Sequence, residues 1–222
     1  MGKIPHVIQS TGAITMGSTY GGVRTGKISE RDHNIGAAIL EIVDNHYFHL
    51  RDIEFDLTTE SFYDLDKQYF ADGKVKQARL ETLYLGDYHS GYTVQEVIDE
   101  THDMISFLKP KHVFVGDVFD GTSISHHSIN NIKAQIQRPE HLFTLEKELN
   151  HLAMNLKSFI QRSPGIKLNI VNGNHEDHLE FYLRECRYKD DRLNHLLALK
   201  LAIHMIENRN PIQEYVFRFF QN

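Results

Sequence analysis

The stretch that decides the fold is His112–Asp120, which reads HVFVGDVFD. Its apolar run, Val113–Val115, is followed at once by Gly116 and by the carboxylate of Asp117. A short run of β-branched and aromatic residues predicts a buried strand. In open α/β folds, sites lie beyond the carboxyl ends of such strands. The stretch therefore predicts one strand of a parallel sheet with a functional residue at its end.

Two further stretches of the chain have the same form. Glu81–Leu85 leads into Gly86–His89 (GDYH), and Lys167–Asn172 leads into Gly173–Glu176 (GNHE). Each string by itself is a common turn sequence. Three such strings in order, each directly after an apolar strand, are not expected by chance. Because parallel strands bring their carboxyl ends to one edge of the sheet, we expect the three strings to converge.

The segments between these strands have helical patterns. Thr93 and Glu96 show capping-box spacing at the start of one helix, which Pro110 ends. Three more helices are expected, over Glu140–Gln161, Asp177–Arg187 and Asp191–Glu207. The order β-α-β-α-β predicts a parallel sheet with right-handed crossovers, so residues 79–222 are expected to form an α/β domain.

Residues 1–78 have the pattern of a β-rich region. Val7–Ser10 is expected to form a short strand, followed by a loop rich in Gly, Ser and Thr over Thr11–Gly26. Two longer strands are expected on either side of Asp44, over Ala37–Val43 and Tyr47–Phe55. The turn at Asp44 suits a tight hairpin. A slip in the alternation near Asp52 predicts a β-bulge.

The composition sets limits on the class of protein. A chain of 222 residues with 41% hydrophobic and 24% charged residues suits one sizeable core, or one core and a small appendage. No apolar run approaches the ~18 residues that span a bilayer, and no signal-peptide pattern is present at the start. The single Cys186 rules out an internal disulfide framework and fits a reducing cytoplasm. The net charge of −6 argues against a general basic surface for nucleic acid, yet it does not exclude a nuclease.

The side chains in the three strings are those that divalent metal ions take as ligands, namely carboxylate, imidazole and amide oxygen. Asp87 and His89 are two residues apart, so an extended backbone would point both to one side. Asp117 offers two oxygens suited to bridging two ions, and Asn174 adds a neutral oxygen. A pair of such ions would lower the pKa of a water and polarise a phosphoryl oxygen.

Other residues of the strings suit catalysis. His175 is placed to donate a proton or a hydrogen bond to a leaving oxygen, and either Glu176 or Asp120 would orient its imidazole. We therefore take His175, Glu176 and Asp120 as catalytic candidates. His126 and His127 follow the second string, and they are expected either to line the cleft and bind substrate phosphate or to lie in a solvated loop.

The set D-x-H, G-D-x-x-D and G-N-H-E, over Glu81–Glu180, resembles the calcineurin-like metallophosphoesterase superfamily. The resemblance implies a β-sandwich flanked by helices, present here in part. It also implies a centre of two divalent metal ions, with Mn as the first choice and Fe, Zn or Mg as alternatives. Asp87 and His89 would bind the first ion, Asp117 would bridge, Asn174 would bind the second, and His175 would serve catalysis.

Strings elsewhere in the chain add a narrower resemblance. Ser10–Thr15, Phe48–Arg51 and Ser123–His127 are similar to strings of the phage pre-early, DNA-degrading phosphoesterases of T-five-type coliphages. This resemblance implies a DNA phosphodiesterase that works in the host cytoplasm, with DNA as its partner and no membrane.

The superfamily pattern continues with an isolated His and then G-H-x-H, and the sequence reaches Asn222 without either. We therefore expect the 79–222 domain to be C-terminally incomplete. The chain would be a fragment, half of a split gene, or a subunit that completes its site from another chain, for instance as a homo-oligomer.

The function expected from these observations is that of a metal-dependent phosphoesterase, specifically a phosphodiesterase that acts on DNA. Two alternatives stay open. A phosphomonoesterase for a nucleotide or phosphoprotein would use the same three strings. A non-catalytic scaffold or assembly module, with a phosphoesterase-like fold that has lost its C-terminal ligands, belongs to a different class of protein.

Overall fold

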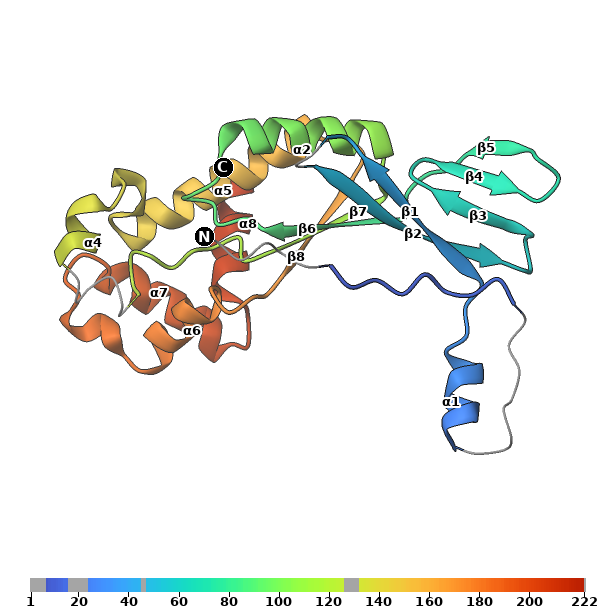
Figure 1. Ribbon diagram of the computed structural model, residues 1–222. Helices are drawn as coiled ribbons and strands as arrows, with labels where there is room; N and C mark the ends of the chain where they lie inside the picture. Colours follow the sequence, from blue (N-terminus) through green and yellow to red (C-terminus); the bar gives the residue numbers. More distant parts are fainter. Residues whose placement is uncertain (1–6, 16–23, 45–46, 126–131, 222) are drawn as a thin grey trace. The chain divides into compact units, whose positions relative to one another are not determined.

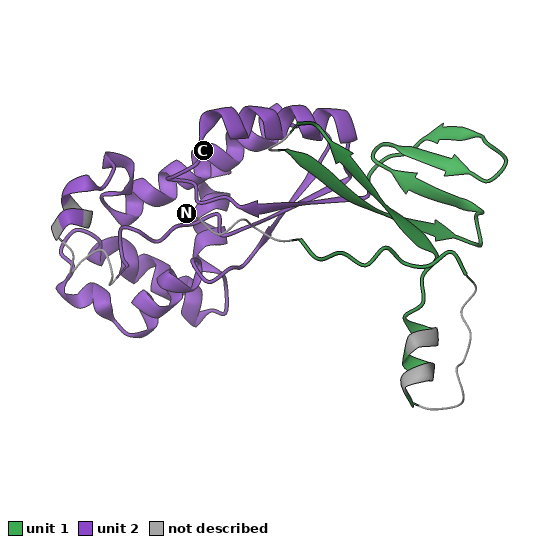
Figure 2. Ribbon diagram, in the orientation of Figure 1, with its two compact units in different colours: residues 1–80 green, residues 81–222 purple. Residues whose placement is uncertain are grey.

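The structure is a computed structural model, which describes residues 7–15, 24–44, 47–125 and 132–221. The chain divides into two compact units, one that runs to Leu80 and one that starts at Glu81 (Figure 2). Together they make a mixed α/β protein with one antiparallel and one parallel sheet. Among the helices described, none is long and apolar enough to span a membrane.

The first unit is built on an antiparallel sheet whose five strands follow the order of the chain. The strands are β1 (Gly36–Ile42), β2 (Phe48–Asp56), β3 (Ser61–Asp64), β4 (Lys67–Phe70) and β5 (Val75–Gln77). The hairpin predicted around Asp44 is confirmed as the β1–β2 pair. The register of that pair runs unbroken from Gly36 opposite Glu54 to Ile42 opposite Phe48.

Three details of the first unit differ from the prediction. Ala38 lies opposite Asp52 in an uninterrupted ladder, so the predicted bulge is wrong. The slip in alternation is tolerated because no residue of β2 is fully buried. Val7–Ser10 is not a strand: Ile8 is 97% exposed, and an apolar run stays irregular without a neighbouring strand to pair with. Helix α1 (Arg24–Arg31) begins inside the segment expected to be a loop.

The second unit contains a three-stranded sheet in the order β6-β7-β8, and both strand pairs are parallel as predicted. Its strands are β6 (Thr82–Asp87), β7 (His112–Gly116) and β8 (Lys167–Val171). The α-helices are α2 (Gln95–Leu108), α4 (Ile132–Gln137), α5 (Leu145–Arg162), α6 (Asp177–Arg184), α7 (His195–Ile206) and α8 (Pro211–Gln221). The described residues of the unit also form two 3₁₀ turns, η1 (Glu140–Leu142) and η2 (Arg187–Asp190).

The helix boundaries refine the prediction. Val94, not Thr93, is the N-cap of α2, and it makes no side-chain cap hydrogen bond, so the predicted capping box is wrong. The helix expected over 140–161 is divided. A 3₁₀ turn comes first, and α5 begins after Thr144, whose side-chain oxygen accepts a hydrogen bond from the Lys147 N–H at 3.2 Å. Helices α4 and α8 were not expected.

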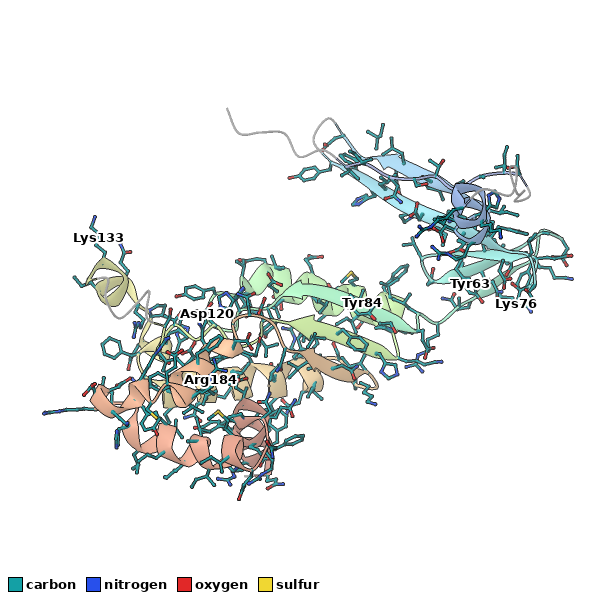
Figure 3. All side chains as sticks on the ribbon, turned by 90° about the horizontal axis from the view of Figure 1, so that it is seen from below. Tyr63, Lys76, Tyr84, Asp120, Lys133 and Arg184 are labelled. Atoms are coloured by element: carbon teal, nitrogen blue, oxygen red, sulfur yellow. The ribbon has the colours of Figure 1, made fainter. Side chains whose placement is uncertain are left out.

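Buried side chains of β7 and α5 form the core of the second unit. Val113 and Val115 of β7 are buried on the face that α2 and α5 cover, and Figure 1 shows both helices along that face. Phe114 points to the opposite face, where its ring stacks on that of Tyr84 at 4.9 Å between centroids. Tyr84 is labelled on β6 in Figure 3. A buried stripe of leucines on α5 anchors the remaining helices, at Leu145, Leu149, Leu152 and Leu156.

Candidate metal centre

The loops that follow β6 and β7 run side by side beyond the ends of the strands. The backbone N–H groups of residues 88–90 donate in sequence to the carbonyl oxygens of residues 116–118, at 2.8–3.1 Å. The loop after β8 joins them through the His175 N–H, which donates to Oδ1 of Asp117 at 3.2 Å. The three strings therefore converge at the carboxyl edge of the sheet.

Two groups of side chains at this edge are compact enough to hold a metal ion. One consists of Asp87, His89 and Asp117, and the other of His89, Asp120 and His175. Within each group, one ligand atom of every residue lies within 4.8 Å of the others. His89 belongs to both groups, so they form a continuous cluster. Asp120, labelled in Figure 3, lies where the strands give way to the helices.

Asp120 orients both histidines of the cluster. Its Oδ1 lies 3.0 Å from Nδ1 of His89, and its backbone carbonyl oxygen lies 2.9 Å from Nδ1 of His175. Because a carbonyl oxygen only accepts hydrogen bonds, Nδ1 of His175 carries a proton. In the neutral ring, Nε2 of His175 then holds the lone pair. The two rings meet edge to face, 4.5 Å between centroids.

Two residues of the cluster have unusual backbone angles. The φ angles of His89 and Asp117 are 43° and 44°, in the left-handed region that side-chain-bearing residues seldom adopt. Each such residue costs on the order of 1 kcal/mol. The strand β6 ends at Asp87, so the expectation of an extended backbone through His89 is wrong. His89 reaches the ligand cluster because the positive φ turns the chain.

The side chain of Glu176 connects the loop after β7 to the loop after β8. Its carboxylate is buried and accepts hydrogen bonds from the N–H of Phe119 at 3.1 Å and from the N–H of Gly173 at 2.9 Å. Both oxygens are thus engaged with the backbone. Of the two residues predicted to orient His175, the described contacts give that role to Asp120, whereas Glu176 joins the β7 loop to the β8 loop.

Sequence reasoning missed two residues that support Asp120. The Thr122 hydroxyl donates to Oδ2 of Asp120, and the N–H groups of Thr122 and Ser123 donate to the carboxylate of Glu148 at 3.0 and 2.9 Å. Glu148 comes from the buried face of α5, next to Leu149. A carboxylate on an apolar helix face was the available signal, since such groups are buried only with partners.

The Glu148 carboxyl gives the unit a specific pH dependence. Burial raises its pKa from 4.5 to about 7. The folded state therefore binds more protons than the unfolded state between pH 4.5 and 7, so this group makes stability fall as pH rises through that window. Relative to Glu148→Gln, the free energy of unfolding of the wild type is expected to fall by up to about 3 kcal/mol between pH 5 and pH 8. Urea unfolding of both proteins at pH 5 and pH 8 measures their free energies of unfolding. If the difference between the two proteins did not change with pH, the raised pKa of Glu148 would be contradicted.

Gly173 leaves the space that Asp117 occupies. A Cβ at Gly173 would lie 1.9 Å from Oδ1 of Asp117, closer than any real contact. We expect Gly173→Ala to displace the Asp117 carboxylate, weaken binding of Mn²⁺ by about tenfold or more, and destabilise the unit by about 1–3 kcal/mol. Gly86→Ala is the matched control, because a Cβ there meets nothing within 4 Å. Calorimetric Mn²⁺ titration of the two variants should separate them, and equal affinities would refute the steric argument.

The remaining predicted site residues lie as follows. Asn174 is exposed on the loop between Gly173 and His175. His126 and His127, expected at the substrate, lie outside the described residues. His178 of α6 is half-buried, and its ring meets that of His175 edge to face at 5.3 Å.

The fold and the site together define an α/β protein with candidate metal ligands at the carboxyl edge of a parallel sheet. The chain is 31% identical to Protein A1 of Escherichia phage T5 over 134 residues, 57% of this chain. That match covers 24% of the phage protein, so the chain spans about a quarter of the length of this relative. No family model matches the chain. No solved structure matches it either. The likeness supports the T-five phage link, while membership of the calcineurin-like superfamily stays a prediction.

Proposed function

We propose that the second unit is a metal-dependent phosphoesterase of the calcineurin-like type, a phosphodiesterase whose substrate is DNA. The observation that carries the proposal is the cluster in which two potential ligand groups share His89. A neutral imidazole has a single lone pair, so His89 would bind one ion, and the two oxygens of the Asp117 carboxylate would allow a second ion beside it. The narrower choice of DNA rests on the resemblance of the N-terminal strings and on the likeness to a phage protein.

The chemistry of the cluster fits hard or borderline divalent ions. The side chains of Asp87, His89 and Asp117 would hold one ion, and Asp117 and Asn174 would contribute to a second. Carboxylates so close to one another repel in the absence of a cation, so a bound ion relieves an unfavourable arrangement. When bound, the ions supply Lewis-acid stabilisation of the charge that develops on the phosphoryl group.

His175 would act as the general acid in this scheme. Its Nδ1–H is committed to the carbonyl oxygen of Asp120, which holds the ring and leaves Nε2 as the atom that gains or gives a proton. As a water molecule attacks phosphorus and the phosphoester bond breaks, a protonated Nε2 would donate its proton to the leaving oxygen. Oδ1 of Asp120 also lies 3.7 Å from Nδ1 of the same ring.

The setting that we propose is the cytoplasm of a phage-infected host, since the relative comes from a phage of Escherichia. A second copy of the chain, or a further segment of polypeptide, would supply the ligands that the superfamily takes from its G-H-x-H string. Mn²⁺ is the first ion to test, followed by Fe, Zn and Mg.

The test combines metal binding with turnover. Titration with Mn²⁺ should show tight, stoichiometric binding, and the loaded protein should hydrolyse bis-p-nitrophenyl phosphate and linear DNA. Faster hydrolysis of p-nitrophenyl phosphate than of the diester would favour the phosphomonoesterase instead. Absence of stoichiometric metal binding would refute the enzyme proposal and favour a scaffold.

A further inference from the structure

A cavity of about 620 Å³ opens beside the cluster of candidate metal ligands, within the second unit. Asp87, His89, Asp120 and His175 form its wall on the cluster side. Its volume is typical of small-molecule sites, which range from roughly 300 to 1,000 Å³. A group attached to a phosphate held at the cluster would therefore reach this cavity directly.

Apart from Thr93 and Thr101, the rest of the cavity is lined by apolar and aromatic residues. The side chains that matter are Val94, Val97 and Ile98 at the start of α2, together with Tyr88, Tyr92 and Phe159. No lysine or arginine is found among the described residues that line it. An anionic phosphate is therefore disfavoured inside the cavity, and an uncharged group is favoured.

Two of the aromatic side chains of the cavity pack against each other, and the third is exposed. Tyr88 and Phe159 meet edge to face, with centroids 6.2 Å apart and planes at 82°. Tyr92 is 54% exposed, and its hydroxyl lies 3.3 Å from Oγ1 of Thr122, the residue that donates to Asp120. This hydrogen bond holds an exposed aromatic face beside the cluster, where a base can stack on it.

We propose that this cavity binds the nucleobase next to the phosphate that the cluster holds. The proposal rests on the proposed function, because it takes the phosphate to lie at the metal centre. It gives the protein a preference for phosphoesters that carry an uncharged aromatic ring over those that carry a small alkyl group. Substitution of Val97 is the most direct test of this preference, since its side chain is 60% exposed and can be replaced without disturbing the core.

The test measures binding of two phosphonates, which resist hydrolysis, to the Mn²⁺-loaded protein by calorimetry. Phenylphosphonate should bind at least about tenfold more tightly than methylphosphonate, as expected for one stacked ring. Thymidine should compete with phenylphosphonate and not with methylphosphonate. In Val97→Gln the preference should fall below about threefold, with methylphosphonate affinity unchanged. Phe107→Gln is the matched control, since Phe107 is 58% exposed on the same helix and does not line the cavity.

The outcomes separate this proposal from the function on which it rests. Equal, Mn²⁺-dependent binding of the two phosphonates would overturn the cavity proposal and leave the metal centre intact. If neither phosphonate binds but thymidine shifts the methyl NMR signals of Val94 and Val97, the cavity stands and the phosphoesterase proposal fails. Absence of both effects overturns both.

Discussion

Asp117→Asn is expected to weaken Mn²⁺ binding by about 100-fold or more while leaving the fold intact. Asp117 is 8% exposed, and its Oδ1 accepts the His175 N–H at 3.2 Å. An asparagine oxygen can accept the same hydrogen bond, so the loop should keep its conformation. It cannot supply the charge or the second oxygen of a carboxylate, so the affinity for a divalent ion falls.

The measurement is the increase in melting temperature on adding Mn²⁺, compared with a calorimetric titration. Without metal, the variant should be at least as stable as the wild type, because it no longer buries a negative charge near Asp87. With metal, most of the stabilisation should be lost, since it reports binding to the folded state. Asp103→Asn, on the exposed side of α2, is the matched control. Unchanged Mn²⁺ affinity in Asp117→Asn would remove Asp117 from the ligand set.

The convergence of the strings could be predicted because it follows from topology. An apolar run such as Val113–Val115 has few alternatives to a buried strand, and parallel pairing then places Asp117 and Asp87 at the same sheet edge. What lies beyond the strand ends depends on loop conformation. The positive φ of His89 and the engagement of Glu176 with two backbone N–H groups have no periodic signal in the sequence.

The errors in the first unit have a related cause. Val7–Ser10 has the composition of a strand, yet a strand forms only with a partner to share its hydrogen bonds, and composition does not report partners. Asp52 interrupts the alternation of β2 without a bulge because both faces of that strand are partly exposed. Glu148, in the second unit, was overlooked for a different reason. The leucines around it mark a buried helix face, where a carboxylate is seldom found.

His175→Ala is expected to lower the turnover of DNA by about 10²- to 10⁴-fold, the usual contribution of a general acid. Nδ1 of His175 is held at 2.9 Å from the Asp120 carbonyl oxygen, so in the proposed reaction Nε2 would be the atom that protonates the leaving oxygen. The loss should be much smaller for bis-p-nitrophenyl phosphate, because nitrophenolate departs without protonation. This difference between substrates is the readout that a merely structural role would not produce.

Two further measurements make the assignment specific. Mn²⁺ affinity of His175→Ala should stay within about threefold of the wild type, since Asp87, His89 and Asp117 are untouched. His178→Ala is the matched control, because its ring also contacts that of His175, and it should change DNA turnover by less than about threefold. If His175→Ala lowered turnover of both substrates equally and lost Mn²⁺ as well, His175 would be a metal ligand, as its place in the His89–Asp120–His175 group allows. Undiminished turnover of DNA would exclude His175 from the chemistry.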